Sequence, residues 1–171
     1  EELNTWTSGT PGYVTTAQAT FDTYGRVTKT IDANTNATDT TYTPTVGSPV
    51  TSNTVTNALG HRTITTFAPA WGSTVAVLDA NDKRTDMAYD PLGRLTGVWK
   101  PGRTKGTDPA NSLFSYDIKK TAPSVVTTKT LSPNGNGPGS SGNYITSHVI
   151  HDGLLRPVQT QLATPDEAGG R

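Results

Sequence analysis

Two histidines and an aspartate near the C-terminal end are the residues that could most directly do chemistry. His148, His151 and Asp152 lie within five positions, as the side chains of a metal site often do. On a strand, however, residues three apart point to opposite faces, so the two imidazoles could not easily share one ion. We therefore interpret both histidines as structural and predict no metal site here.

Two acidic segments resemble the opening of a calcium-binding loop. In Asp32-Ala33-Asn34-Thr35-Asn36 the ligand spacing is suitable, but Ala37 stands where glycine is expected and Thr43 stands where a bidentate glutamate is expected. The segment from Asp79 to Lys83 would place an ammonium group against the cation. The sequence therefore predicts no calcium site, and no other metal or cofactor.

The remaining chemistry-bearing residues do not form a recognisable active site. No Gly-x-Ser-x-Gly elbow frames a nucleophile, and no glycine-rich phosphate loop precedes a helix. We therefore expect no catalytic residues and no enzyme activity. Of the three tryptophans that could stack on a sugar, Trp6, Trp71 and Trp99, we expect Trp99 to pack in the core. Trp71 lies in a turn and is the candidate for an exposed contact.

Composition predicts an all-β protein. Only 32% of residues are hydrophobic and 16% are charged, while about one residue in five is threonine, which favours strands. The 17 glycines and 12 prolines indicate many turns. Net charge is zero with no basic stripe, which disfavours nucleic-acid binding. There is no cysteine, and no apolar run predicts membrane insertion.

A short phrase, aromatic-Asp-x-x-Gly-Arg, returns along the chain. Its eleven key residues are Phe21, Asp22, Gly25, Arg26, Tyr89, Asp90, Gly93, Arg94, His151, Asp152 and Arg156. A second phrase, in which alanine follows Asp or Asn, begins at Asp32, Asn57 and Asp79. Half-units of ten or eleven residues thus alternate two turn chemistries and leave about six residues for each strand.

Each recurring residue type has a predicted role in the turn. Glycine supplies a positive φ, and aspartate accepts turn N–H groups. We expect the arginine to reach a carboxylate or carbonyl on a neighbouring turn, and the aromatics to stack on one another. Leu155 replaces the glycine of the third copy, so that turn should be distorted, as should the turn after Phe21. Gly97, in a strand, should accept a β-branched residue.

These residues resemble the RHS/YD-repeat family, whose members include teneurin-like YD repeats. The segment from Tyr89 to Thr96 matches the family motif, and the segment from Asn57 to Thr63 is similar to its companion turn. The resemblance covers residues 13–104 and 144–161. It implies a curved or spiralling antiparallel sheet of β-hairpin repeats, forming a segment of a hollow shell. Asp90-Pro91-Leu92-Gly93 is similar to the family's self-cleavage element, but it occurs once, so we expect no autoproteolysis.

The resemblance also implies a function and partners. The chain would belong to a secreted or cell-surface bacterial protein whose shell encloses and presents a C-terminal toxin or effector domain. Its partners would be that domain and neighbouring repeat segments of the same chain. The alternative is a module that binds a cell-wall glycan through its exposed turns, Trp71 and two loops.

All 171 residues are interpreted as one segment of a larger protein with about a dozen strands. Its predicted parts are a polar lead-in, clear repeats that open with a strand from Tyr13 to Asp22, irregular strands with a Gly/Pro/Ser-rich loop, a degenerate repeat and a tail, spanning residues 1–12, 13–104, 105–143, 144–162 and 163–171.

Overall fold

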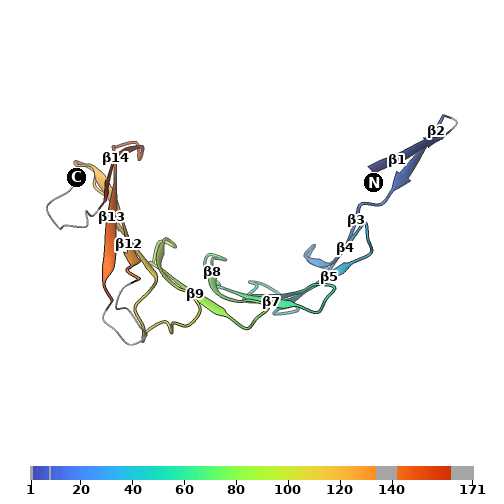
Figure 1. Ribbon diagram of the computed structural model, residues 1–171, viewed down its shortest axis with the longest axis horizontal. Helices are drawn as coiled ribbons and strands as arrows, with labels where there is room; N and C mark the ends of the chain where they lie inside the picture. The colour runs from blue at the N-terminus through green and yellow to red at the C-terminus, as the bar shows by residue number, and fades with distance from the viewer. Residues whose placement is uncertain (1, 8, 134–141, 163–171) are drawn as a thin grey trace. The chain divides into compact units, whose positions relative to one another are not determined.

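The computed structural model describes residues 2–7, 9–133 and 142–162, and every regular element in these ranges is a β-strand (Figure 1). The predicted all-β class is therefore confirmed. Within the same residues no helix is long and apolar enough to cross a membrane. The predicted tail at 163–171, and most of the Gly/Pro/Ser-rich loop, lie outside the described residues.

The chain divides into two compact units, Glu1–Asp82 and Lys83–Arg171. The first opens with an antiparallel hairpin of β1 (Glu2–Thr7) and β2 (Thr10–Val14). A meander comes next, made of β3 (Ala17–Phe21), β4 (Val27–Asp32), β5 (Ala37–Thr43), β6 (Ser52–Thr56), β7 (Arg62–Phe67) and β8 (Thr74–Leu78). The polar lead-in, expected to be a loop or the end of an incoming strand, thus forms most of a hairpin. The strand predicted from Tyr13 to Asp22 is divided between β2 and β3.

The second unit is a meander of six antiparallel strands. They are β9 (Arg84–Tyr89), β10 (Leu95–Trp99), β11 (Ser112–Asp117), β12 (Ser124–Leu131), β13 (Tyr144–His151) and β14 (Pro157–Leu162). Strands β3 to β14 follow one another in chain order in one antiparallel sheet, of which β3 and β14 are the edge strands. The predicted antiparallel sheet is confirmed, and the described strands number fourteen where about a dozen were expected.

Because successive strands reverse direction, the turns alternate between the two ends of the strands. In each unit we call the end that carries the Asp-x-x-x-Arg turns the arginine edge. In the first unit it carries residues 22–26, 44–51 and 68–73, and in the second unit residues 90–94, 118–123 and 152–156. The companion turns at 32–36 and 57–61 lie at the opposite edge. The Asp-x-x-x-Arg turns and these companion turns therefore lie at opposite ends of the strands.

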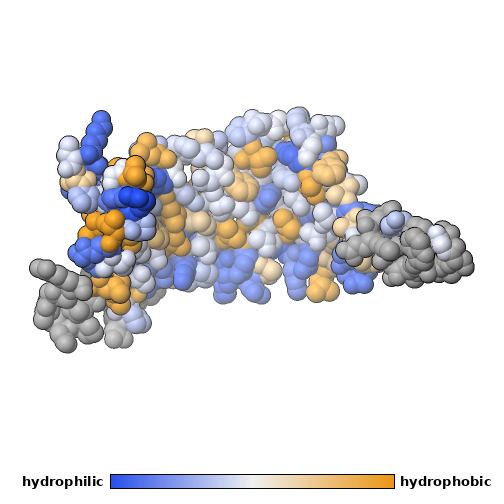
Figure 2. Space-filling view, turned by 90° about the horizontal axis from the view of Figure 1, so that it is seen from above, coloured by the Kyte–Doolittle hydropathy of each residue, from blue (hydrophilic) through white to orange (hydrophobic). Residues whose placement is uncertain are grey.

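Little of the sheet is buried. Among the described residues the only buried apolar side chains are Ala76 and Ala110, and no side chain is fully enclosed. Apolar side chains are scattered among polar ones on the face that Figure 2 shows. A single sheet buries apolar surface well only when a second layer covers one of its faces. The described residues do not provide that layer.

Gly97 corrects one expectation. It is a buried strand residue, and a Cβ atom added to it would lie 2.8 Å from Cη2 and 2.9 Å from Cζ3 of the Trp99 ring. The prediction that this position accepts a β-branched residue is therefore wrong, because the ring already occupies the space. Trp99 packs against the backbone here and donates a hydrogen bond from Nε1 to Asp108 O at 3.0 Å.

Candidate functional site

The turn at 90–94 shows the geometry that the repeat encodes. Asp90 Oδ1 accepts hydrogen bonds from the backbone N–H groups of Leu92 and Arg94, both at 2.9 Å. Gly93 N donates to Asp90 O at 2.9 Å, and Gly93 has a φ of 76°. This is a hairpin loop of three residues in which a residue in the left-handed region comes after a turn. The predicted positive φ and the predicted use of the carboxylate are both present.

Five further turns share features of this backbone pattern, and they include the companion turns. Each begins with Asp or Asn, whose Oδ1 accepts the N–H two residues later, and whose C=O accepts the N–H three residues later; they begin at Asp22, Asp32, Asn57, Asp79 and Asp152. The prediction of two turn chemistries is therefore wrong. One geometry recurs, and the two phrases differ mainly in the fifth residue.

In four of these turns the side chain of the fifth residue donates a hydrogen bond to Oδ2 of the first residue. Arginine donates from Nε to Oδ2 of the aspartate in its own turn, at 2.6 Å for Arg26, 2.7 Å for Arg94 and 2.8 Å for Arg156. Asn36 makes the equivalent bond to Asp32 Oδ2 at 2.9 Å. The arginine was expected to reach a carboxylate or a carbonyl on a neighbouring turn. Its carboxylate partner lies instead within its own turn, whereas Arg26 does reach a neighbouring carbonyl, Thr45 O, at 2.7 Å.

The third copy is not distorted by the loss of glycine. Leu155 adopts a φ of 60°, and Asp152 N donates to Arg156 O at 3.0 Å as in the other copies. Thr35 and Asp82 adopt similar angles, 65° and 55°, at the same position of their turns. The bonds to the first residue hold the backbone in the left-handed region even where a side chain disfavours it. Phe21 likewise precedes an undistorted turn.

We predict that Leu155→Gly raises the free energy of unfolding by about 1 kcal/mol, because the left-handed conformation costs a non-glycine residue about that much. Chemical denaturation followed by circular dichroism would measure it. Gly25→Leu is the reverse control, since Gly25 has a φ of 75° and a Cβ there would meet no atom within 4 Å. It should lose a similar amount. A destabilised Leu155→Gly variant would contradict the strain at Leu155.

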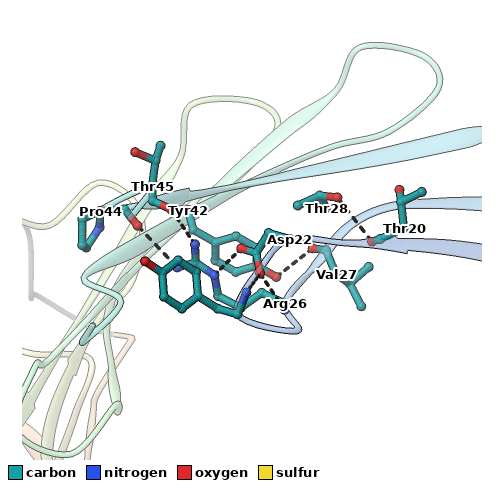
Figure 3. A network of polar contacts seen from close by, with 9 residues as sticks. Thr20, Asp22, Arg26, Val27, Thr28, Tyr42, Pro44 and Thr45 are labelled. Carbon is teal, nitrogen blue, oxygen red and sulfur yellow. Dashed lines mark hydrogen bonds and ion pairs between the residues drawn. The ribbon is translucent and has the colours of Figure 1, made fainter. Parts of the chain in front are cut away.

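Beyond its own turn, Arg26 ties the β3–β4 hairpin to the next strand (Figure 3). Its guanidinium lies 4.6 Å from the centroid of the Tyr42 ring on β5. The Tyr42 hydroxyl donates to Val27 O at 2.9 Å, and Arg26 Nη2 donates to Thr45 O at 2.7 Å. The hairpin, strand β5 and the loop after β5 are therefore joined by one polar cluster.

The second unit repeats this cluster. The Arg94 guanidinium lies 4.5 Å from the centroid of the Tyr116 ring on β11, and the Tyr116 hydroxyl donates to Leu95 O at 2.8 Å. In both units the tyrosine bonds to the residue directly after the arginine. We call the Asp, Arg and Tyr side chains of one unit a clamp. Sequence reasoning missed its tyrosines and predicted contacts between aromatics, whereas the clamps stack an arginine on a tyrosine.

The turns lower the pKa values of their carboxyl groups. The backbone N–H of Arg94 and the Arg94 side chain hold the pKa of Asp90 below its ordinary 3.8, and Arg156 acts in the same way on Asp152. The Asn36 side chain does so at Asp32. At Asp22 desolvation is the largest influence and acts to raise the pKa, but hydrogen bonds from Arg26 and Tyr24 together outweigh it.

The lowered pKa of Asp90 predicts that the chain loses stability in acid. Because the folded-state pKa of Asp90 lies below the unfolded value, its stabilisation is complete above that value and is lost as the pH falls through the folded pKa. Asp90→Asn keeps the Oδ1 acceptor, as Asn57 does naturally, but cannot titrate. Its free energy of unfolding should fall less steeply than that of the unmodified chain between about pH 5 and pH 2. Equal slopes would contradict this role for the carboxylate.

The described residues form a metal site neither at the Asp32 loop nor at His148 and His151. Both oxygens of Asp32 accept hydrogen bonds within its turn, from Asn34 N, Asn36 N and Asn36 Nδ2. His148 pairs across the sheet with Thr127 and His151 with Ser124, which places the two imidazoles on opposite faces. Across the described ranges no three His, Asp or Glu side chains are grouped so that they could hold a metal ion.

Trp71 lies in the turn at 68–73 and is 54% exposed, as predicted. The other two turns of this edge in the first unit also expose a large apolar residue, Tyr24 and Val46. Next to the Trp71 turn is a groove of about 440 Å³ whose lining includes Tyr42, Pro49, Phe67 and Gly72. Asn53 also lines it, and its buried Oδ1 has no hydrogen-bond partner. The Trp6 side chain lies outside what the structure describes.

Comparison with known proteins gives weak structural likenesses only. No family model matches the chain, and no curated protein matches it. Among solved structures, a chain of the Photorhabdus luminescens Tc holotoxin pore with mutant TccC3 aligns at 15% identity and a TM-score of 0.44, and a chain of the TcdB2–TccC3–Cdc42 complex at 15% and 0.38. Each alignment covers 91% of this chain but 9% of the other. These values do not assign the chain to a family.

Proposed function

We propose that the chain is a wall segment of an RHS-type shell in a larger, secreted or surface-exposed bacterial protein, and that the shell contains and presents a C-terminal effector. The observation that supports this most is the clamped single sheet. The strands follow one another in chain order, and the residues that the structure describes form almost no buried core. A polar cluster in each unit joins an Asp–Arg hairpin to the next strand. Such a sheet can separate two spaces.

The polar groups of the clamps are already hydrogen-bonded within the protein. Each carboxylate accepts bonds from its own turn, each guanidinium is bonded to that carboxylate, and the tyrosine hydroxyls donate to backbone carbonyls. A catalytic site needs groups that are free to accept or donate a proton at a substrate. The repeat residues thus fit a structural role, in agreement with their recurrence.

Limited proteolysis of the parent protein tests the proposal. Arg94→Ala combined with Tyr116→Ala should open the connection between β9–β10 and β11, and the enclosed domain should be cleaved several times faster. The control is Lys119→Ala, which removes a positive charge from an ion pair with Asp117 that is exposed on both sides, and it should leave the cleavage rate unchanged. Equal cleavage in both variants, or loss of effector activity on replacing His61, His148 or His151 alone, would contradict containment.

A glycan-binding module is the second candidate, favoured by the groove beside the Trp71 turn. A sugar could stack there on the ring of Tyr42 or Phe67, and a rotation of the Asn53 side chain would let its Oδ1 accept a sugar hydroxyl. Bacterial cell-wall glycans on an array would be the probe. Binding that Trp71→Ala and Asn53→Ala each abolish would support this function, and a chain that binds none of them would exclude it.

A further inference from the structure

The residue after the aspartate differs among the three Asp–Arg turns in a way that matters for covalent chemistry. It is Thr23 in the first turn, Pro91 in the second and Gly153 in the third. A backbone nitrogen that follows an aspartate can attack the side-chain carboxyl carbon and form a five-membered succinimide ring. Proline has no N–H group for this reaction, and a β-branched residue such as threonine hinders the approach. Of the three turns, the third alone has an unhindered nucleophile next to its aspartate.

The Asp152–Gly153 pair also differs from the companion turns, which place alanine after their first residue. Within the described ranges no other Asp or Asn precedes a glycine. Gly153 N donates no hydrogen bond to any described residue, and a Cβ atom added to Gly153 would meet nothing within 4 Å. Neither a hydrogen bond nor crowding therefore holds this nitrogen away from the carboxyl carbon.

Hydrogen bonds within the turn oppose the attack on Asp152. Its Oδ1 accepts from Leu154 N at 2.9 Å and from Arg156 N at 3.0 Å. Its Oδ2 accepts from Arg156 Nε at 2.8 Å and pairs with Nη2 at 2.7 Å. These bonds fix the plane of the carboxylate and stabilise its ionised form, whereas the cyclisation consumes the neutral acid. All of them lie within residues 152–156, so they do not depend on what adjoins β14.

We propose that Asp152–Gly153 is a site of spontaneous isomerisation, and that the Arg156 side chain controls its rate by keeping the turn closed. When the turn opens, Gly153 N bonds to Asp152 Cγ, and the carboxyl OH leaves with the N–H proton as water. A second water molecule then opens the succinimide. Its attack at the former backbone carbonyl gives isoaspartate, in which the chain runs through Cγ. No oxidant or cofactor takes part.

The product cannot rebuild the turn. The closed turn needs Asp152 N bonded to Arg156 O and Leu155 N bonded to Asp152 O, each at 3.0 Å. Isoaspartate adds one methylene group to the backbone and moves the carboxylate, so these bonds lose their geometry. Leu155, whose φ is 60°, then has nothing to hold it in the left-handed region. Isomerisation should therefore loosen the hairpin of β13 and β14 permanently.

Timed incubation of the chain in a mildly acidic buffer tests the proposal. Mass spectrometry with electron-based fragmentation distinguishes aspartate from isoaspartate at each position, although their masses are equal. Arg156→Ala should form isoaspartate at position 152 about tenfold faster than the unmodified chain, because it loses charge-assisted hydrogen bonds. The matched control is Arg26→Ala, which removes the same bond from Asp22 and should give little isoaspartate there, since Thr23 hinders the attack.

Two further variants keep the test decisive even if Arg156→Ala unfolds. Gly153→Ala, for which the structure has room, should slow the reaction severalfold by hindering the nitrogen. Leu155→Gly relieves backbone strain in the closed turn and should slow it about fivefold, which corresponds to about 1 kcal/mol. Equal rates in the unmodified chain, Arg156→Ala and Leu155→Gly would overturn the proposal, as would no excess of isoaspartate at position 152 over position 22. Either result would leave the proposed containment in the parent protein untouched.

Discussion

Gly97→Val is expected to lower the free energy of unfolding by about 3 kcal/mol. Position 97 is buried, and the new side chain would have to displace the Trp99 ring, which lies within 3 Å of the first added atom. The ring cannot easily move away, because Nε1 is bonded to Asp108 O and the Lys105 ammonium lies 5.7 Å from the ring centroid. Chemical denaturation followed by circular dichroism would give the value.

The matched control for this substitution is Gly153→Val. Gly153 has no positive φ, and a Cβ atom there would meet nothing within 4 Å. The control should change the free energy of unfolding by less than about 1 kcal/mol. If both substitutions have the same cost, the contact between Gly97 and the Trp99 ring does not limit this position.

Tyr116→Ala is expected to destabilise the chain by about 3 kcal/mol, and Tyr116→Phe by about 1 kcal/mol. The alanine variant loses a half-buried ring, the stacked Arg94 guanidinium and the bond to Leu95 O, whereas the phenylalanine variant loses only the bond. Tyr24→Ala is the control, because the Tyr24 ring is 52% exposed at a turn even though Arg26 lies 5.0 Å from its centroid. It should cost less than about 1 kcal/mol, and an equal cost for Tyr24→Ala and Tyr116→Ala would contradict the role of the clamp.

The elements of the fold were largely predictable, because their signals are local. The high threonine content predicted an all-β protein, and Asp90 with Gly93 predicted the turn between β9 and β10. The hairpin of β1 and β2 was not predicted, since its polar sequence resembles that of a loop. The two phrases were taken for two turn types because side chains at variable positions differ while the backbone bonds are shared.

The clamps could not be predicted from spacing. Arg26 and Tyr42 are sixteen positions apart, whereas Arg94 and Tyr116 are twenty-two apart, because the connection between β4 and β5 is a short turn and that between β10 and β11 is a long loop. In both clamps the arginine stacks on the tyrosine in the same way, although the number of residues between the two differs. Leu155 was misjudged for a related reason, since bonds from neighbouring residues enforce a backbone angle that its own side chain disfavours.

The central claim is that the polar repeat residues stabilise the sheet by joining an Asp–Arg hairpin to the next strand. A double-mutant cycle between Arg94→Ala and Tyr116→Ala measures that link directly, from the free energies of unfolding of the two single variants and the double variant. The clamp predicts an interaction free energy of about 1 kcal/mol, as expected for a partly buried guanidinium stacked on an aromatic ring. Strictly additive effects, with an interaction below about 0.3 kcal/mol, would show that the two side chains act independently and would contradict the clamp.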